Sequence, residues 1–398
     1  MRFLQTGDWH LGKVFFGASL IEDQKFFLAQ VAEELTAAQN CGEPYDALIV
    51  PGDIYDRAVP PAEAVSALGA FLSQAHRNFP ALKLFFLAGN HDSPERLAFA
   101  QDVLGESNIH ICTDCKNIAE PVIVNGVAVY QLPYLNAGCI VRKDADEGEF
   151  SEPLRTQQEL LDAAVERIAS THKKNYGGMD AVLCAHLFTA GALRSDSERI
   201  AVGNAEQADA ASLSFFTYAA LGHLHKFQKA AENAYYSGSP LAYSFDESAI
   251  EKCMLRVTLQ DGSFTVEKRP VKPLHRCTVI TDQFDAIYNS DAYDAFADDY
   301  IQVICTDRSA IANPMNILRS KFANALSFAY ESQHFSAQES AQSAERRQLL
   351  STAEVAPEAL VTAFLKSVYG EAAVSEDETF QEEIKLFAQF AKEIGGAQ

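Results

Sequence analysis

The sequence lacks any hydrophobic run close to the roughly 20 residues that a membrane-spanning helix needs, so nothing in it indicates a membrane protein. It also lacks the charged region and apolar segment of a secretory signal, because residues 1–6 form an expected strand that enters the fold at once. Its eight cysteines have neither the density nor the spacing of a disulfide framework. These absences predict a cytoplasmic protein.

A second cysteine pair, which a structural zinc site would need, is also missing. Cys112 and Cys115 form one Cys-x-x-Cys pair, and no matching pair follows. We therefore expect ordinary reduced thiols at these positions.

Positive charge is scarce, with 32 basic residues against 54 acidic residues and a net charge of −22. Phosphate binding is driven by clustered Lys and Arg, so the chain cannot present a broad basic surface to nucleic acid. If the substrate is DNA, metal ions and a partner protein must hold much of it. The phosphate-binding loop Gly-x-x-x-x-Gly-Lys-Ser/Thr is absent too, so any dependence on ATP must reside in another chain.

What the sequence does contain is a composition of 48% hydrophobic and 22% charged residues, which is typical of a globular protein. Its 398 residues exceed the ~250 at which a single core stops growing. We expect one large domain and at least one smaller one.

The first 100 residues repeat one pattern of apolar strand, polar loop and amphipathic helix. Strands near residues 3–4, 47–50 and 84–87 each end in a loop that carries Asp, His or Asn. Helices are expected over about 21–39, after Pro60-Pro61, and from Ser93. Because successive βα units place their strand ends on one edge of a sheet, these loops should converge.

The second half of the large domain repeats this design with histidines. An Asn125-Gly126 hairpin and a helix over about 153–172 precede two strands that end in His186 and in Gly222-His223-Leu224-His225. Imidazoles, carboxylates and one amide suit borderline divalent ions such as Mn²⁺, Fe²⁺ or Zn²⁺. The number of potential ligands favours two ions, about 3.5–4 Å apart, which is the arrangement that clamps the oxygens of a phosphoryl displacement.

Five short motifs carry a resemblance to a known family. They are Asp8-x-His10, Gly52-Asp53-x-x-Asp56, Gly89-Asn90-His91-Asp92, His186 and Gly222-His223-x-His225. In this order they resemble the motifs of the calcineurin-like metallophosphoesterases. The resemblance implies an α/β fold, a four-layer α/β/β/α sandwich over residues 1–270.

The resemblance also implies two metal positions that share one carboxylate. One ion would be held by Asp8, His10, Asp53 and His225. The other would be held by Asp53, Asn90, His186 and His223. A hydroxide activated by both ions, for which Mn²⁺ is the expected metal, would attack phosphorus.

Three further residues of the motifs receive roles without binding metal. The resemblance implies that His91 contacts the phosphate and protonates the leaving oxygen, and that Asp56 supports this chemistry from behind the ligands. Asp92 is expected to hold its loop rather than touch the substrate.

Segments outside these motifs resemble the bacterial SbcD family of nuclease subunits, which are related to double-strand-break repair nucleases. They are residues 8–13, 187–198, 202–203 and 236–247. Gly7 departs from the Ser that the family commonly has there. The resemblance implies a double-strand exonuclease and single-strand or hairpin endonuclease in DNA repair, recombination and replication. The resemblance also implies that this nuclease acts with an SbcC-type SMC-like ATPase partner.

The C-terminal third predicts a second domain. A hairpin over 252–268, turning at Asp261-Gly262, is expected to complete the second sheet of the sandwich. Residues 271–330 are expected to form a small α/β capping domain over the cleft, with strands at 277–280 and 300–304 and helices at 283–296 and 315–326.

A linker rich in Ser, Gln, Glu and Ala is expected over 331–355. Residues 356–398 then predict a helical pair with one apolar face on each helix, at 357–369 and 378–394. These helices are too short to be stable alone, so they either pack on their own chain or, as the resemblance implies, bind the coiled-coil base of the ATPase. We expect a heterotetramer with a nuclease homodimer formed through the early helices.

Two other function classes remain open. A phosphatase or phosphodiesterase of the same fold with a non-DNA substrate would explain the acidic charge, but it would leave the capping domain and the helical pair without a purpose. A metal-bound but inactive scaffold is disfavoured because every expected ligand and His91 are present.

Overall fold

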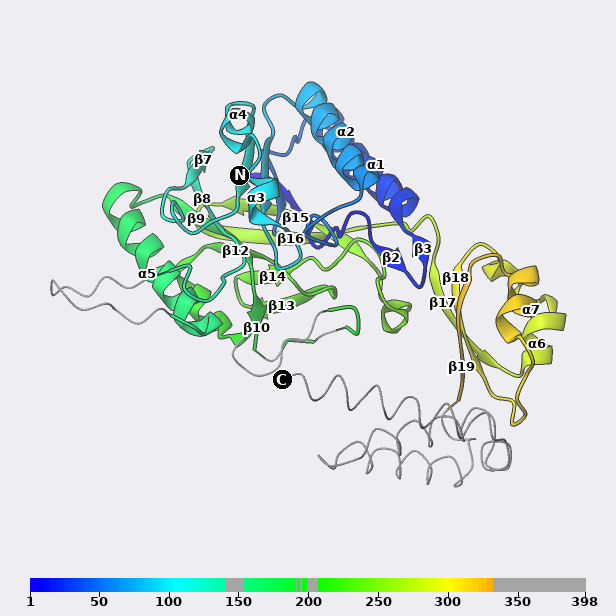
Figure 1. The fold of residues 1–398 in the computed structure, drawn as a ribbon. Helices are drawn as coiled ribbons and strands as arrows, with labels where there is room; N and C mark the ends of the chain where they lie inside the picture. The colour runs from blue at the N-terminus through cyan, green and yellow to red at the C-terminus, as the bar shows by residue number, and fades with distance from the viewer. Residues whose placement is uncertain (141–153, 191, 194, 199–206, 332–398) are drawn as a thin grey trace, which may run out of the picture. The chain divides into compact units, whose positions relative to one another are not determined.

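The computed structural model describes residues 1–140, 154–190, 192–193, 195–198 and 207–331 (Figure 1). Contacts divide the chain into one unit of Met1–Cys305 with Ile311–Ala329 and another of Thr306–Ala310 with Tyr330–Gln398. The sandwich belongs to the first unit. The predicted linker and the helical pair lie outside the described residues, and the predicted domain boundaries stay predictions.

The first sheet has six strands in the order β16-β15-β1-β4-β5-β6. Strands β1 (Arg2–Gln5), β4 (Ala47–Val50), β5 (Lys83–Leu87) and β6 (Ile109–Cys112) run parallel. They are joined by β15 (Cys253–Gln260) and β16 (Ser263–Pro270), which form an antiparallel hairpin.

The position of this hairpin corrects the sequence-based expectation, which assigned it to the second sheet. Strand β15 pairs antiparallel with β1, with Phe3 opposite Val257. Alternate residues of β15, including Leu255 and Val257, face the core between the two sheets. The alternating pattern predicts a hairpin with one buried face, but it carries no information about which strand lies beside it.

The second sheet has the order β13-β14-β12-β9-β8-β7. Its central strands are β8 (Val127–Leu132), β9 (Asp180–His186) and β12 (Tyr218–Gly222), all parallel. Its edge strands are β7 (Val122–Val124) and β13 (Gln228–Ala231), and β14 (Ala234–Tyr236) lies between β13 and β12. The predicted hairpin between β7 and β8 is confirmed, with positive φ at both Asn125 and Gly126.

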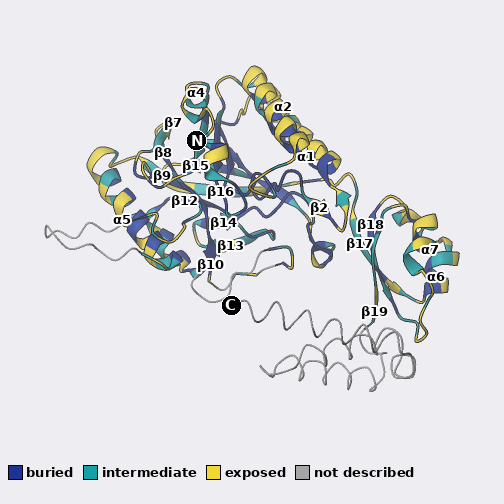
Figure 2. Cartoon of the chain, in the orientation of Figure 1, coloured by how far each residue is buried: buried dark blue, intermediate teal, exposed yellow. Residues whose placement is uncertain are grey.

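Three hydrophobic clusters show the four layers of the sandwich. The first cluster joins inward residues of both sheets, such as Phe3 and Tyr218. The second packs α1 (Ile21–Asn40) and α2 (Ala62–Asn78) on the outer face of the first sheet. The third packs α5 (Gln157–Asn175) on the outer face of the second sheet. Figure 2 shows the buried strands between helices whose outer faces are exposed, which confirms the α/β/β/α prediction.

Several helix boundaries differ from the expectation. Helix α5 begins after Thr156, which forms a capping box with Glu159, rather than at residue 153. The helix expected from Ser93 is only α3 (Pro94–Leu97), followed by α4 (Gln101–Glu106). Shorter elements near the strand ends are β2 (Val14–Phe15), β3 (Ala18–Ser19), β10 (Phe188–Thr189), β11 (Gln207–Ala208), η2 (Ala210–Phe215) and η3 (Phe245–Glu247).

The expected small α/β domain contains a three-stranded sheet in the order β17-β18-β19. The strands are β17 (Cys277–Asp282), β18 (Tyr300–Cys305) and β19 (Ala325–Tyr330). The helix expected over 283–296 is instead α6 (Phe284–Asn289) and the 3-10 helix η4 (Asp291–Phe296), because Ser290 interrupts the first and caps the second. The helix expected over 315–326 was also too long, because α7 (Pro314–Lys321) ends before β19.

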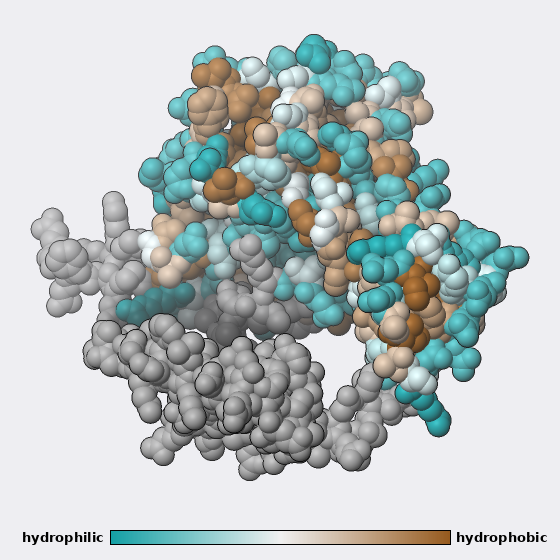
Figure 3. Space-filling view, turned by 45° about the vertical axis from the view of Figure 1, so that its right-hand side comes forward, coloured by the Kyte–Doolittle hydropathy of each residue, from teal (hydrophilic) through white to brown (hydrophobic). Residues whose placement is uncertain are grey.

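Within the described ranges, no helix combines the length and the apolar character needed to cross a bilayer. In the view of Figure 3, hydrophilic residues cover much of the visible face, with smaller groups of hydrophobic residues among them.

Candidate metal centre

The predicted ligands come from loops at the carboxyl ends of five parallel strands. Asp8 and His10 follow β1, Asp53 follows β4, and Asn90 follows β5. His186 ends β9, and the remaining two, His223 and His225, follow β12. The sandwich brings the two sets together, since the backbone N–H of His223 donates to Asp8 Oδ1 at 2.8 Å.

Four of these residues have a left-handed backbone. The φ angles are 53° at Asp8, 45° at His10, 49° at Asp53 and 109° at His223. Residues other than glycine adopt such φ angles at a cost in free energy. Residues held in this conformation concentrate at functional sites. The fold therefore fixes the backbone conformation of these loops.

Asp53 lies between the two predicted groups of ligands. Its Oδ2 is 3.6 Å from His10 Nε2 and also 3.6 Å from His186 Nε2. Its Oδ1 accepts the backbone N–H of His91 at 3.0 Å. Burial alone would raise the pKa of Asp53, but the surrounding histidines outweigh burial and hold this pKa below its usual range. The carboxylate is thus charged and equidistant from both groups, as a bridging ligand would be.

Lone pairs converge at the second group. His186 Nδ1 is 2.8 Å from the Pro51 carbonyl oxygen, so it carries the proton and donates. The other nitrogen, Nε2, then has a lone pair that faces Asn90 Oδ1 at 2.9 Å. The same amide oxygen is 3.1 Å from His223 Nδ1. A cation would relieve the repulsion between the two acceptors, His186 Nε2 and Asn90 Oδ1.

Ring nitrogens also lie close together in the first predicted ligand group, at His10 and His225. The Nε2 atoms of His10 and His225 are only 3.1 Å apart. Ser197 Oγ is 2.6 Å from both His225 Nδ1 and Glu247 Oε1. Because the carboxylate can only accept, the hydroxyl donates to Glu247 and accepts from His225 Nδ1–H. In the neutral ring this arrangement leaves the lone pair on His225 Nε2, the nitrogen that faces His10.

Asp8 completes the argument for a cation. Its Oδ2 is buried and has no hydrogen-bond partner among the residues that the structure describes. Burial, followed by repulsion from Asp53, raises the pKa of Asp8 well above its ordinary value. Burial also lowers the pKa of His10 and of His223 to about 3, so both rings are neutral and able to bind metal. The residues fit two divalent cations, while the assignment of each ligand to an ion stays a prediction.

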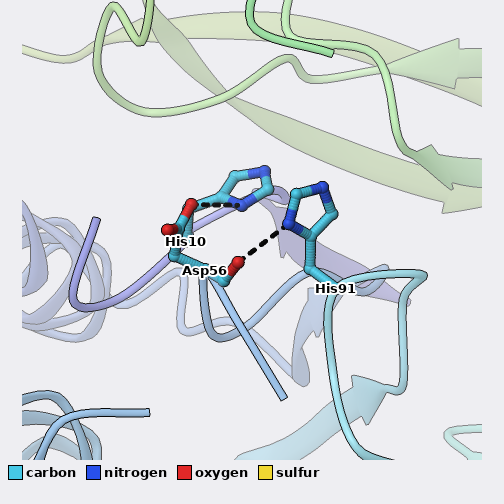
Figure 4. Close-up of side chains that lie close together, drawn as sticks. All are labelled: His10, Asp56 and His91. Atoms are coloured by element: carbon cyan, nitrogen blue, oxygen red, sulfur yellow. Dashed lines mark hydrogen bonds and ion pairs between the residues drawn. The ribbon is translucent and has the colours of Figure 1, made fainter. Parts of the chain in front are cut away.

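Asp56 and His91 lie beside this centre (Figure 4). The Asp56 carboxylate is 3.6 Å from His10 Nδ1 and 2.9 Å from Lys13 Nζ. Its backbone oxygen is 2.8 Å from His91 Nδ1. Although burial would raise the pKa of Asp56, His10 and Lys13 outweigh burial and lower it. Asp56 therefore orients both histidines.

Asp92 holds its loop, as expected from the sequence. Its carboxylate accepts the backbone N–H groups of Ile54, Tyr55 and Gly89 at 2.9 to 3.1 Å. Burial, with a further contribution from Asp53, raises the pKa of Asp92 to about 7.

Glycine is required where the loops approach most closely. A Cβ on Gly89 would lie 2.1 Å from Asp53 Oδ1. A Cβ on Gly52 would lie 2.3 Å from His186 Nδ1, and this residue has φ of +90°. Any larger residue would displace a predicted ligand.

The sequence analysis assigned no role to the residues that support His225. Glu247 is fully buried and ion-paired with Lys252, whose Nζ also donates to the His225 carbonyl oxygen at 2.9 Å. Glu198 Oε1 accepts the His225 backbone N–H at 2.7 Å. The only sequence signal was that Ser197, Glu198 and Glu247 lie in segments that carry the family resemblance.

Comparison with known proteins agrees with this geometry. The family model for calcineurin-like phosphoesterases matches residues 1–226. A solved structure of a dimetal phosphatase from Danio rerio matches with a TM-score of 0.39 and 11% identity, over 69% of this chain and 97% of that chain. At this score and identity, the likeness carries no argument about the substrate.

Proposed function

Because the chain belongs to the calcineurin-like phosphoesterases, we propose that it is a metal-dependent DNA nuclease subunit that works with an SbcC-type ATPase. At the level of the family, it is a hydrolase of phosphoesters. The proposal adds the substrate, DNA ends and hairpins, and the partner.

One observation carries the proposal. The segments that resemble the SbcD family outside the metal motifs gather around the same two histidines. The Tyr243 ring lies 5.3 Å from the His10 ring and 5.5 Å from the His225 ring, and its hydroxyl donates to the Trp9 carbonyl oxygen at 2.5 Å. Ser197 holds His225 from the other segment. These segments therefore belong to the working site, which supports a function shared with the family they resemble.

The chain's own residues supply the proton chemistry. When bound, two divalent cations, which we propose are Mn²⁺, provide Lewis acidity for water and for the phosphoryl oxygens. His91 is buried and its Nδ1 is held by the Asp56 backbone oxygen. Its Nε2 is thus the nitrogen left to face the substrate, and in the doubly protonated ring this nitrogen would hand its proton to the leaving oxygen of the DNA. Asp56 and Lys13 keep this arrangement in place.

The net charge of −22 supports a partner that contributes to DNA binding and to ATP use. We propose that residues 356–398 bind this partner. A homodimer through the early helices is supported by exposed hydrophobic residues near α2 to α4, because Val65, Phe99 and Val103 are 48%, 83% and 67% exposed.

A phosphatase acting on a non-DNA substrate is the second candidate. It is favoured by the same acidic charge, which repels a long polyanion. The two candidates differ in substrate, since a nuclease cleaves diesters and a phosphatase prefers monoesters.

The test is cleavage of a linear DNA duplex by the full chain with Mn²⁺, alone and with an SbcC-type partner plus ATP. Hydrolysis of bis(p-nitrophenyl) phosphate and p-nitrophenyl phosphate is measured in parallel, with His91→Ala as the control. We expect cleavage that requires Mn²⁺, rises with partner and ATP, and falls about 10²–10⁴-fold in His91→Ala. Intact DNA together with rapid monoester hydrolysis would establish the phosphatase instead.

A further inference from the structure

Two cysteines that are 24 residues apart in sequence meet in the fold. Cys115 Sγ lies 3.3 Å from Cys139 Sγ, and both are free thiols. Cys115 follows β6, and Cys139 lies in the segment that follows β8. The other cysteine of the Cys-x-x-Cys pair, Cys112, is not the partner of Cys115. Instead, Cys112 Sγ lies near the backbone oxygens of Asp114 and Gln131, at 3.5 and 3.7 Å.

The two thiols differ in access to solvent. Cys139 is exposed, whereas Cys115 is 7% exposed. Both line a cleft of about 1010 Å³, whose walls also include Lys116, Asn136 and Arg167. A small oxidant can therefore reach Cys139, with Cys115 directly behind it.

The pKa values of the two thiols also favour reaction of Cys139 before Cys115. The Cys115 thiol donates to Cys139, and this bond lowers the pKa of Cys139. The same bond, followed by burial, raises the pKa of Cys115. Since the thiolate is the reactive form, Cys139 is the cysteine that is oxidised first.

We propose that Cys115 and Cys139 are a redox-active pair that closes to a disulfide on reaction with a peroxide. The Cys139 thiolate attacks one peroxide oxygen, the O–O bond breaks, and a sulfenic acid and water form once protons are transferred. Cys115 sulfur then attacks the Cys139 sulfur and releases the second water. Two thiols lose two electrons and two protons, and the peroxide is reduced to two waters.

The bond would covalently link two loops, one of which reaches the metal centre. The segment that carries Cys139 also contains Tyr134, whose backbone N–H donates to the Ala88 carbonyl oxygen at 2.9 Å. The Tyr134 ring lies 6.1 Å from the His186 ring. The proposal is independent of the proposed nuclease function, because it concerns only the thiols.

The test treats the full-length protein with one equivalent of hydrogen peroxide, followed by maleimide labelling and tryptic mapping. The peptides 97–116 and 117–142 contain Cys112 with Cys115 and Cys139, respectively. We expect them to be joined, two hydrogen atoms lighter than the sum of the separate peptides, with free thiols falling from eight to six. Dithiothreitol should reverse the change.

Matched variants identify the partner of Cys139. Cys112→Ser should still form the linked peptides, and Cys115→Ser should leave Cys139 as a sulfenic or sulfinic acid. If a variant misfolds, peptide mapping of the peroxide-treated wild-type protein still identifies the partner of Cys139. Fragmentation of the linked peptides in the mass spectrometer distinguishes a bond at Cys112 from one at Cys115. A link through Cys112, a link between two chains, or labelled thiols at both positions after peroxide would overturn the proposal.

Discussion

At the scale of single residues, the metal centre depends on which nitrogen of each histidine carries the proton. Pro51 selects this nitrogen in His186 through a backbone oxygen, and Ser197 with Glu247 selects it in His225. Groups that orient a histidine in this way raise its basicity and fix its ring. The support of His225 is therefore part of the metal centre, although it contacts no predicted ion position.

Replacing Ser197 or Glu247 should weaken metal binding more than it lowers the stability of the fold. We expect Ser197→Ala and Glu247→Gln to lower Mn²⁺ affinity about 10–100-fold, because the His225 ring loses its fixed orientation. Isothermal titration calorimetry on metal-free protein measures this directly. Asp246→Asn is the control, since Asp246 is adjacent to Glu247 in sequence and exposed, and its carboxylate accepts hydrogen bonds from Asp196, Lys226 and Ser244 rather than from His225. Equal affinity in all three variants would contradict the assignment.

The neutral buried histidines also predict how the metal-free protein responds to acid. The folded pKa of His10 and of His223 is about 3, and the ordinary value is 6.5. Between these values the unfolded state binds more protons, so their contribution to stability is present above pH 6.5 and is lost as the pH falls toward 3. Each histidine adds a slope of about 1.4 kcal/mol per pH unit. The raised pKa values of Asp8 and Asp92 act in the opposite direction and offset this slope, so the contribution of a histidine is read from the difference between variant and wild type.

Urea unfolding of EDTA-treated protein at several pH values between 7.5 and 4.5 measures this slope. His223→Asn should flatten it by about one proton, because one of the two histidines is removed. A slope that is the same in the variant and in the wild type would show that His223 is not buried in the neutral form.

At the scale of elements, α1 is tied to the hairpin that enlarges the first sheet. Glu34 on α1 accepts from Arg256 on β15 at 2.9 Å and from two nitrogens of Arg269 on β16 at 2.9 and 3.0 Å. Tyr45 donates to the same carboxylate at 2.5 Å. Burial would raise the pKa of Glu34, but these donors outweigh burial and lower it. One carboxylate therefore joins a helix and two strands.

Glu34→Gln should lower the free energy of unfolding by about 2 kcal/mol, because several charge-assisted hydrogen bonds are weakened at once. The matched control on the same helix is Glu22→Gln, which breaks an exposed pair with Lys25 and should change stability by only about 0.5 kcal/mol or less. Denaturant titration measures both. Equal effects would show that the Glu34 cluster behaves as an ordinary surface ion pair.

At the scale of the whole molecule, the proposed partner should bind through the apolar faces predicted within residues 356–398. We expect Phe364→Asp to weaken binding of an SbcC-type ATPase at least tenfold, because a charge would enter an apolar interface. Hydrolysis of bis(p-nitrophenyl) phosphate by the chain alone should not change. Thr362→Asp is the control, because Thr362 is a polar residue on the opposite side of the same predicted helix. Pull-down and titration calorimetry measure the binding, and undiminished binding of Phe364→Asp would exclude this helix as the contact.

The sequence by itself determined the order of strands and helices in the sandwich and the residue types at the strand ends. Both are local properties. Alternating or helical periodicity marks an element, and Asp, His and Asn after an apolar strand mark a polar loop. The rule that parallel strand ends share an edge then predicted that Asp8, Asp53 and Asn90 converge.

Only the tertiary structure decided which distant segments are neighbours. It placed β15 beside β1 rather than in the second sheet, it ended α7 early to form β19, and it brought Glu247 behind His225 and Cys139 beside Cys115. Each of these pairings joins residues far apart in the chain or depends on competition between packing arrangements. Local periodicity carries no information about such contacts, because a buried face specifies that it must be covered but not by which segment.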